Sequence, residues 1–220
     1  PTLTGDMLAM LAHSVGFTYV CRQAGEQVLA LQGPGELITI TGPQEVSEGG
    51  SITLGIAPQA APSGVAASNK ALYTANSGSD TVSIVDFTMG QVKDAVKVGW
   101  GPVDLVLSPD GKRLYSADSQ GNTVTVMDVD TATGNLKLVQ SLPVQPNPVA
   151  LAHHPTAQRL FIVCQNDNSL LEVDTNALNV VTRLAVGTSP AGVALTPDGK
   201  QAWVVLNGAK QIAIVGTTSP

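Results

Sequence analysis

The chain has 220 residues, of which 43% are hydrophobic and 13% charged, and it carries a net charge of −6 at neutral pH. The apolar share excludes a disordered chain, and 11 Lys and Arg against 17 Asp and Glu make nucleic acid a poor partner. No apolar run reaches the roughly 18 residues that a membrane span needs, so we expect no membrane insertion. Because Gly (22) and Pro (14) are both abundant, the composition favours a turn-rich, all-β protein.

Residues 1–60 contain strand-like stretches that follow the pattern of the later sequence only weakly. The candidate strands are residues 17–21, 28–31, 36–41 and 51–56. Residues 11–19 align without gaps with residues 107–115, which predicts a divergent copy of the later repeat with one inserted hairpin. Alternatively, Asp6 caps a short helix and residues 1–60 form a small separate domain. Both interpretations stay open at this point.

Residues 61–220 contain a repeat of just over forty residues. Its aromatic anchors, spaced by 42, 46 and 42 residues, are Tyr73, Tyr115, Phe161 and Trp203. Each anchor lies in an apolar strand and is expected in the core, and each is followed by a polar turn and an alternating strand. Four strands per unit at this period are typical of a β-propeller blade. The sequence therefore predicts an all-β fold, a β-propeller of four-stranded antiparallel blades, about five in number, with a divergent first blade.

The last unit ends after its third strand, at Val215. A strand from the other end of the chain, residues 1–4 or 37–41, would complete this unit and close the ring. In the alternative, the blades form an open arc whose exposed edges are covered by another subunit.

The units resemble the YVTN-type β-propeller repeats of YncE-like and surface-layer-like bacterial proteins. The resemblance is carried by Ser108-Pro-Asp-Gly-Lys-Arg-Leu-Tyr115, by the segment from Asn122 to Gly134, and by Thr196-Pro-Asp-Gly-Lys200. It covers about residues 57–216 well. The resemblance implies a propeller with around seven blades and a secretion signal, whereas this chain starts without the positive region of a signal peptide. Related propellers include lactonases, redox-linked dehydrogenases and surface proteins, so the resemblance implies a fold and no particular function.

Three side chains are candidates for chemistry or for contact with a partner. His153 and His154 form the one paired candidate for metal binding or acid–base chemistry. Adjacent strand residues point to opposite faces, so we expect no metal site at this pair. Trp100, between Gly99 and Gly101, is a candidate partner contact, and the alternative is that its ring wedges between two blades.

The other polar residues have structural interpretations. Asp110 and Asp198 lie in Pro-Asp-Gly turns, and Asp174 is expected to cap the turn after its strand. Cys21 and Cys164 are expected to be free, buried thiols because each follows an apolar strand.

From these observations we expect a non-catalytic propeller, not an enzyme, that needs no cofactor and presents a weakly charged surface to other protein subunits. Such a surface suits a structural subunit of a virion, as in a phage capsid or tail, or of a cell-surface layer. One alternative is a periplasmic or extracellular propeller enzyme, lactonase-like or dehydrogenase-associated, with His153 and His154 at its funnel. A glycan-binding propeller is a further alternative.

Overall fold

A computed structural model gives the backbone of residues 18–20, 28–31, 39–41 and 51–53, and the backbone and side chains of residues 60–86 and 91–217. These residues form nineteen strands in five antiparallel sheets, and the strands of every sheet follow one another in chain order. Within these described ranges, no helix is long and apolar enough to cross a membrane. The prediction of an all-β propeller of antiparallel blades, about five in number, is confirmed.

The first two sheets have four strands each. The first sheet contains β1 (Thr18–Val20), β2 (Val28–Leu31), β3 (Thr39–Thr41) and β4 (Ser51–Thr53). The second sheet contains β5 (Pro62–Ala67), β6 (Ala71–Asn76), β7 (Thr81–Asp86) and β8 (Gln91–Lys97).

The remaining sheets repeat this arrangement. The third sheet contains β9 (Pro102–Leu107), β10 (Arg113–Asp118), β11 (Thr123–Val129) and β12 (Leu136–Pro143). The fourth contains β13 (Pro148–His153), β14 (Arg159–Cys164), β15 (Ser169–Asp174) and β16 (Asn179–Ala185). The fifth contains β17 (Pro190–Leu195), β18 (Gln201–Leu206) and β19 (Gln211–Gly216), and no fourth strand joins it among the described residues.

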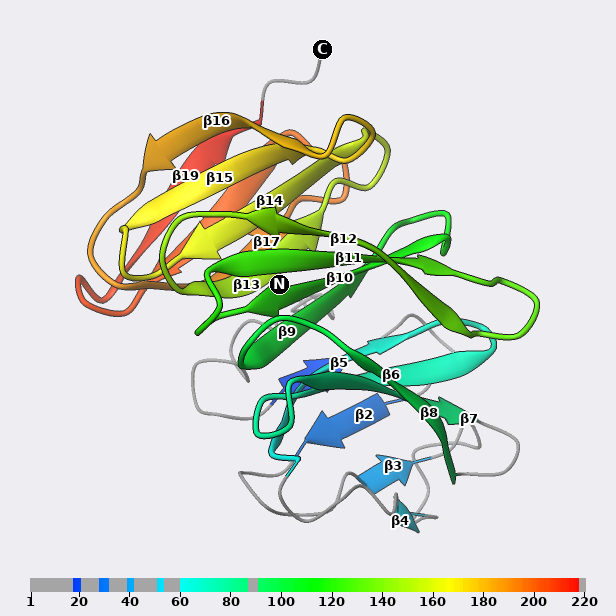
Figure 1. Cartoon of the computed structure of the whole chain (residues 1–220). Helices are drawn as coiled ribbons and strands as arrows, with labels where there is room; N and C mark the ends of the chain where they lie inside the picture. The colour runs from blue at the N-terminus through cyan, green and yellow to red at the C-terminus, as the bar shows by residue number, and fades with distance from the viewer. Residues whose placement is uncertain are drawn as a thin grey trace.

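The sheets are arranged as consecutive blades, which Figure 1 shows from the cyan β5 and β6 to the red β19. The first strands of neighbouring sheets lie side by side, β5 against β9, β9 against β13 and β13 against β17. The last strands, β8, β12 and β16, lie at the periphery and are mostly exposed. Each of these last strands has a bulge near its start, at the equivalent place in its pairing with the third strand of its sheet.

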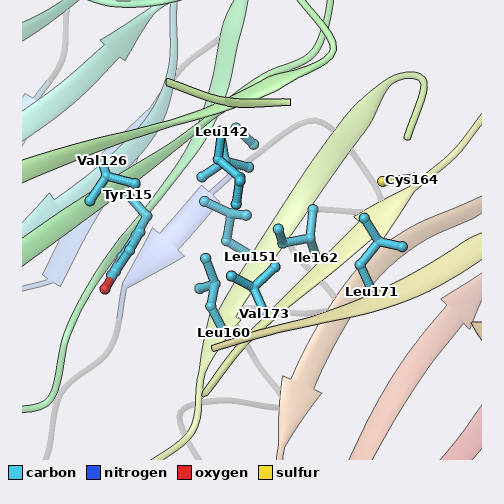
Figure 2. Packing of buried hydrophobic residues seen from close by; sticks show 11 residues of the cluster. Tyr115, Val126, Leu142, Leu151, Leu160, Ile162, Cys164, Leu171 and Val173 are labelled. Carbon is cyan, nitrogen blue, oxygen red and sulfur yellow. The ribbon is translucent and has the colours of Figure 1, made fainter. Parts of the chain in front are cut away.

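The core lies between the sheets, in layers that repeat along the chain. In each layer, the anchor-bearing face of one sheet packs on an aliphatic face of the next. Figure 2 shows the layer between the third and fourth sheets, in which Tyr115 and Val126 of one sheet face Leu151, Leu160 and Val173 of the other. Full burial of such a side chain contributes about 1.5–3 kcal/mol, so these layers hold adjacent sheets together.

A polar link between sheets also repeats. In the second to fifth sheets, one residue of the hairpin after the second strand has a left-handed backbone. In three of these sheets, the side-chain oxygen of that residue accepts a hydrogen bond from the backbone N–H just before the next sheet. The three pairs are Asp80 with Gly101 (3.0 Å), Asn122 with Asn147 (2.9 Å) and Asn168 with Ser189 (2.8 Å). Asp and Asn suit both tasks, because they tolerate a positive φ and their side chains carry an acceptor.

Several sequence predictions can be compared with this fold. Tyr73, Tyr115 and Phe161 are buried as expected, but Trp203 is only half-buried, because the face of the fifth sheet that it occupies carries no further sheet among the described residues. Cys164 is a free, buried thiol, and burial raises its pKa to about 12. Cys21 lies outside the described residues.

Two predictions concern residues 1–60: that a strand from this region completes the last sheet, and that the region is a divergent blade or a separate domain. The suggestion that residues 37–41 complete the last sheet is wrong for the part described, because β3 pairs with β2 and β4 in the first sheet. Residues 1–4 lie outside the described residues. The four strands of the first sheet form a single meander, while the assignment of residues 1–60 as a divergent blade or a separate domain stays a prediction.

Candidate functional site

The candidate site is a polar hollow of about 580 Å³ between the third and fourth sheets. It opens at the end of the sheets where the β9–β10 and β11–β12 connections lie. Its lining residues are Ser108, Asp110, Lys112, Arg113, Tyr115, Asp128, Val129, Asp130, Thr131, Gln158 and Asn176. All but one of these side chains are polar, so the hollow suits a hydrophilic ligand.

The Pro-Asp-Gly turn between β9 and β10 fixes the first carboxylate of the hollow. The Ser108 hydroxyl donates to Asp110 Oδ1 at 2.6 Å, and the Lys112 backbone N–H donates to the same oxygen at 3.1 Å. These contacts, with the Ser108 bond first, hold the pKa of Asp110 below its usual range, so the group is ionised at neutral pH. Gly111 completes the turn with a φ of +70°.

Arg113, at the start of β10, is the best-anchored cation of the hollow. Its Nε lies 3.4 Å from Asp128 Oδ1, and its Nη1 donates to the backbone carbonyl of Thr175 in the fourth sheet's loop. The neighbouring Tyr115 is buried, and burial raises the pKa of its phenol, so the hydroxyl keeps its proton at neutral pH. The floor of the hollow thus carries a fixed guanidinium and a neutral phenol.

Asp130 also lines the hollow and lies in the β11–β12 connection. Its carboxylate accepts hydrogen bonds from the Ala132 backbone N–H (2.9 Å) and the Thr133 hydroxyl (2.8 Å). These bonds, the Thr133 hydroxyl first, lower the pKa of Asp130. A second ionised carboxylate therefore stands at the mouth of the hollow.

His154 serves the fold. It is buried, and its Nδ1 accepts hydrogen bonds from the backbone N–H groups of Thr156 (3.1 Å) and Ala157 (2.8 Å). At the equivalent position of the other sheets, the hydroxyls of Ser108 and Thr196 also accept from a backbone N–H, that of the first residue of the following strand. The imidazole therefore replaces a turn-forming hydroxyl.

His153 lies behind the hollow. Its Nδ1 donates to the His154 carbonyl at 2.8 Å, and its ring centroid is 5.9 Å from that of Tyr115. The other nitrogen, Nε2, is buried without a hydrogen-bond partner, and burial lowers the pKa of the imidazole. Among the described residues, no group of three His, Cys, Asp or Glu side chains could hold a metal ion.

Trp100 is too exposed for its ring to be packed between two blades. Its side chain is 68% exposed, so the alternative that it wedges between blades is wrong. It lies on the β8–β9 connection, at the end of β9 opposite the hollow. Its backbone carbonyl accepts hydrogen bonds from Gln120 and Gly121, which fixes the loop and leaves the ring outward. A role in partner contact stays a prediction.

The inner strands offer less chemistry than the hollow. The one carboxylate on β5, β9, β13 and β17 is Asp104, and both of its oxygens are engaged, Oδ1 with the Leu105 N–H (2.9 Å) and Oδ2 with the Leu151 N–H (2.8 Å). The bond from Leu151 joins the neighbouring inner strands β9 and β13. The hollow, in contrast, has five charged side chains in its lining, which are Asp110, Lys112, Arg113, Asp128 and Asp130.

Sequence reasoning did not find the hollow. Asp110 was assigned to its turn, and no motif linked it to residues from the fourth sheet such as Gln158 and Asn176. One difference between the repeats was visible in the sequence, since the position of Arg113 is occupied by Gln201 in the last unit.

Comparison with known proteins places this propeller in a family. The model of the lactonase family, described as a 7-bladed β-propeller, matches residues 12–153 and, in a second overlapping alignment, residues 64–217. The chain therefore belongs to this family of propellers.

Individual relatives are more distant. The chain is 24% identical over 148 residues to a 6-phosphogluconolactonase of Erwinia tasmaniensis, which covers 61% of this chain and 42% of the relative. It is 28% identical over 102 residues to the uncharacterized YncE of Salmonella typhi, which covers 46% of this chain and 28% of the relative. Among solved structures, the periplasmic gluconolactonase of Pseudomonas aeruginosa superimposes with a TM-score of 0.65 at 19% identity, covering 94% of this chain and 64% of that chain. At that identity the likeness shows the fold alone. The chain spans less than half the length of these two sequence relatives.

These findings correct the functional expectation. Membership in the lactonase family, with a 6-phosphogluconolactonase among the sequence relatives, contradicts the expectation of a non-catalytic protein. The propeller-repeat resemblance holds at the level of the fold family, since YncE is among the relatives.

Proposed function

We propose that this chain is the propeller of a lactone hydrolase that opens sugar lactones. The observation that carries the proposal is the lactonase family match over most of the chain. Of the alternatives considered from the sequence, the lactonase-like enzyme is the one that the relatives support, and no finding supports a virion or surface-layer subunit. Assignment of the repeats to the YVTN type is part of this proposal and is supported by the YncE relative.

The hollow contains the groups that ring opening requires. A water molecule attacks the lactone carbonyl carbon, and a carboxylate accepts the proton of that water. We assign this role to Asp110, whose two hydrogen bonds described above both fall on Oδ1, so that Oδ2 serves the water.

Charge on the carbonyl oxygen then has to be stabilised. The guanidinium of Arg113 is held in place by Asp128 and by the Thr175 carbonyl, so it is preorganised as a hydrogen-bond donor to an oxyanion. When the tetrahedral intermediate collapses, the ring C–O bond breaks and the proton returns from Asp110 to the leaving alkoxide. The product is the open hydroxy acid.

The test is hydrolysis of glucono-δ-lactone by the purified chain, followed in a pH-stat and corrected for spontaneous opening. We expect Asp110→Asn to lower kcat/KM by about a hundredfold, because a positioned base contributes on the order of 10²–10⁴. The matched control is Asp198→Asn, since Asp198 makes the same turn bonds in the fifth sheet, from the Thr196 hydroxyl (2.6 Å) and the Lys200 N–H (3.0 Å). Wild-type activity at the spontaneous rate would overturn the proposed function, and equal loss in both variants would overturn the role of Asp110.

A further inference from the structure

The charges of the hollow are unbalanced. Three carboxylates, Asp110, Asp128 and Asp130, face two cations, Lys112 and Arg113. Lys93 attracts Asp130 from β8, but its ammonium donates to the Thr133 carbonyl at 3.2 Å and it does not line the hollow. The lining therefore carries a net negative charge.

Both cations of the lining are already matched to carboxylates. Arg113 pairs with Asp128 at 3.4 Å and donates to the Thr175 carbonyl, while Lys112 follows Asp110 by two residues and attracts its carboxylate. A phosphate dianion needs cations or N–H groups directed at it, and a site that binds one usually clusters them. Here the carboxylates beside the two cations offset much of their attraction for a dianion, and the Asp130 carboxylate in the lining would repel it.

The same lining suits neutral hydroxyl groups. Carboxylates accept hydrogen bonds from hydroxyls, and such charge-assisted bonds are stronger than neutral ones. The amides of Gln158 and Asn176 and the hydroxyl of Thr131 add both donors and acceptors around the same space. The hydroxyl groups of an uncharged polyhydroxy ring can therefore hydrogen-bond to several side chains of the lining, and the ring adds no negative charge to the hollow.

We propose that the hollow selects uncharged polyhydroxy lactones and discriminates against lactones that carry a phosphate group. This inference rests on the proposed function and adds the substrate class. It separates two kinds of lactonase that occur among the relatives, one acting on a phosphorylated sugar lactone and one on a gluconolactone.

The first experiment compares kcat/KM for glucono-δ-lactone and its 6-phosphate at two ionic strengths. We expect the uncharged lactone to be preferred by at least about tenfold at low salt, and the preference to shrink with salt because screening weakens the repulsion. Equal or better turnover of the phosphorylated lactone would overturn the selectivity and leave the proposed function standing.

A variant pair tests the cause. Asp130→Asn keeps an acceptor oxygen for the Ala132 N–H and removes one negative charge from the lining, so the ratio of kcat/KM for the phosphorylated lactone to that for the uncharged lactone should rise by roughly three- to tenfold. Asp198→Asn, outside the hollow, should change neither value. An unchanged ratio in Asp130→Asn would contradict the electrostatic argument.

A binding measurement separates failure of the two proposals. Calorimetric titration with glucitol and with glucitol 6-phosphate needs no turnover. Suppose that neither lactone is hydrolysed, that glucitol binds more tightly than glucitol 6-phosphate, and that Asp130→Asn reduces this difference in affinity. The proposed lactone hydrolysis is then wrong, and the proposed selectivity against phosphate stands. If glucitol 6-phosphate binds at least as tightly as glucitol, the selectivity is wrong whatever the activity.

Discussion

His153 occupies a position that Leu107 and Leu195 fill in the equivalent units of the third and fifth sheets. Its Nε2 is buried without a partner, which is an uncommon and costly state for a polar atom. Burial also lowers the pKa of the imidazole below 6.5, so the folded chain binds its proton less readily than the unfolded chain does. Above the pKa that His153 has in the unfolded chain, neither state binds this proton, and the site does not lower the free energy of unfolding. As the pH falls below that pKa, the unfolded chain takes up the proton first, so the free energy of unfolding decreases.

We predict that His153→Leu stabilises the chain by about 1 kcal/mol near neutral pH, because it removes the unpaired atom and restores the residue of the other repeats. The gain should grow as the pH falls from 7.5 to 5.5, since only the wild type then takes up a proton on unfolding. Urea unfolding at both pH values measures this. A difference in stability that does not depend on pH contradicts the assignment of a lowered pKa.

Gly199 and Gly111 test the contact between His154 and the next sheet. Both glycines have a φ near +70°, but a Cβ at Gly199 would lie 2.3 Å from the ring of His154, whereas the nearest atom at Gly111 is 4.0 Å away. We expect Gly111→Ala to lower the free energy of unfolding by about 1 kcal/mol, because alanine disfavours a positive φ. Gly199→Ala should lower it by about 1–3 kcal/mol more, because its Cβ also clashes with the His154 ring. Thermal or urea unfolding compares the two. In a His154→Ser background, the extra cost of Gly199→Ala should disappear, and its persistence would show that another contact causes it.

At the scale of the elements, the hairpin links join one sheet to the next. Asn122 combines a φ of +55° with an acceptor for the Asn147 N–H, while the equivalent Lys210 has nearly the same φ and no acceptor. The pattern Asn-Thr-Val at residues 122–124 predicts the hairpin but not the link, because the partner lies 25 residues away.

We predict that Asn122→Gly lowers the free energy of unfolding by about 1 kcal/mol, because it leaves the Asn147 N–H without its acceptor while glycine tolerates the backbone conformation. Lys210→Gly is the matched control, and we expect it to be neutral or slightly stabilising. Urea unfolding of the two variants distinguishes loss of the link from a backbone effect. Equal losses at both positions would contradict the link.

The elements themselves were largely predictable from the sequence. The Pro-Asp-Gly turns, the alternating strands and the buried anchors Tyr73 and Tyr115 follow from local patterns that repeat along the chain. The hollow was not predictable in this way, because Arg113 and Gln158 meet only when two sheets pack side by side. Trp203 was misjudged for the same reason, since its burial depends on whether another sheet covers its face.

At the scale of the whole molecule, the fifth sheet shows what happens where the repeat of layers stops. Trp203 pairs with Ile214 and Val205 with Ile212 on the face turned away from the fourth sheet. The two isoleucines are 59% and 52% exposed, respectively. The equivalent face of the fourth sheet, with Phe161, is buried by the fifth.

Because exposed apolar faces promote association, we expect the wild-type chain to self-associate as its concentration rises. Ile212→Lys with Ile214→Lys should shift this association to a concentration at least about tenfold higher, as measured by light scattering. Val181→Lys, at a 52% exposed position on the outer strand β16, is the control and should have little effect. Unchanged association in the double variant would contradict a role for this face.

In the proposed reaction, this lactonase-family propeller opens lactones with the charged groups between its third and fourth sheets. The most direct test measures kcat/KM for glucono-δ-lactone in two variants, Arg113→Gln and Arg159→Gln. Glutamine is the residue found at the equivalent position 201. Arg159 is the equivalent cation of the fourth sheet and lies outside the hollow, so its variant is the control. We predict a loss of at least about a hundredfold for Arg113→Gln, as for removal of one oxyanion donor, and less than about threefold for Arg159→Gln. Wild-type activity in a folded Arg113→Gln variant would contradict the claim.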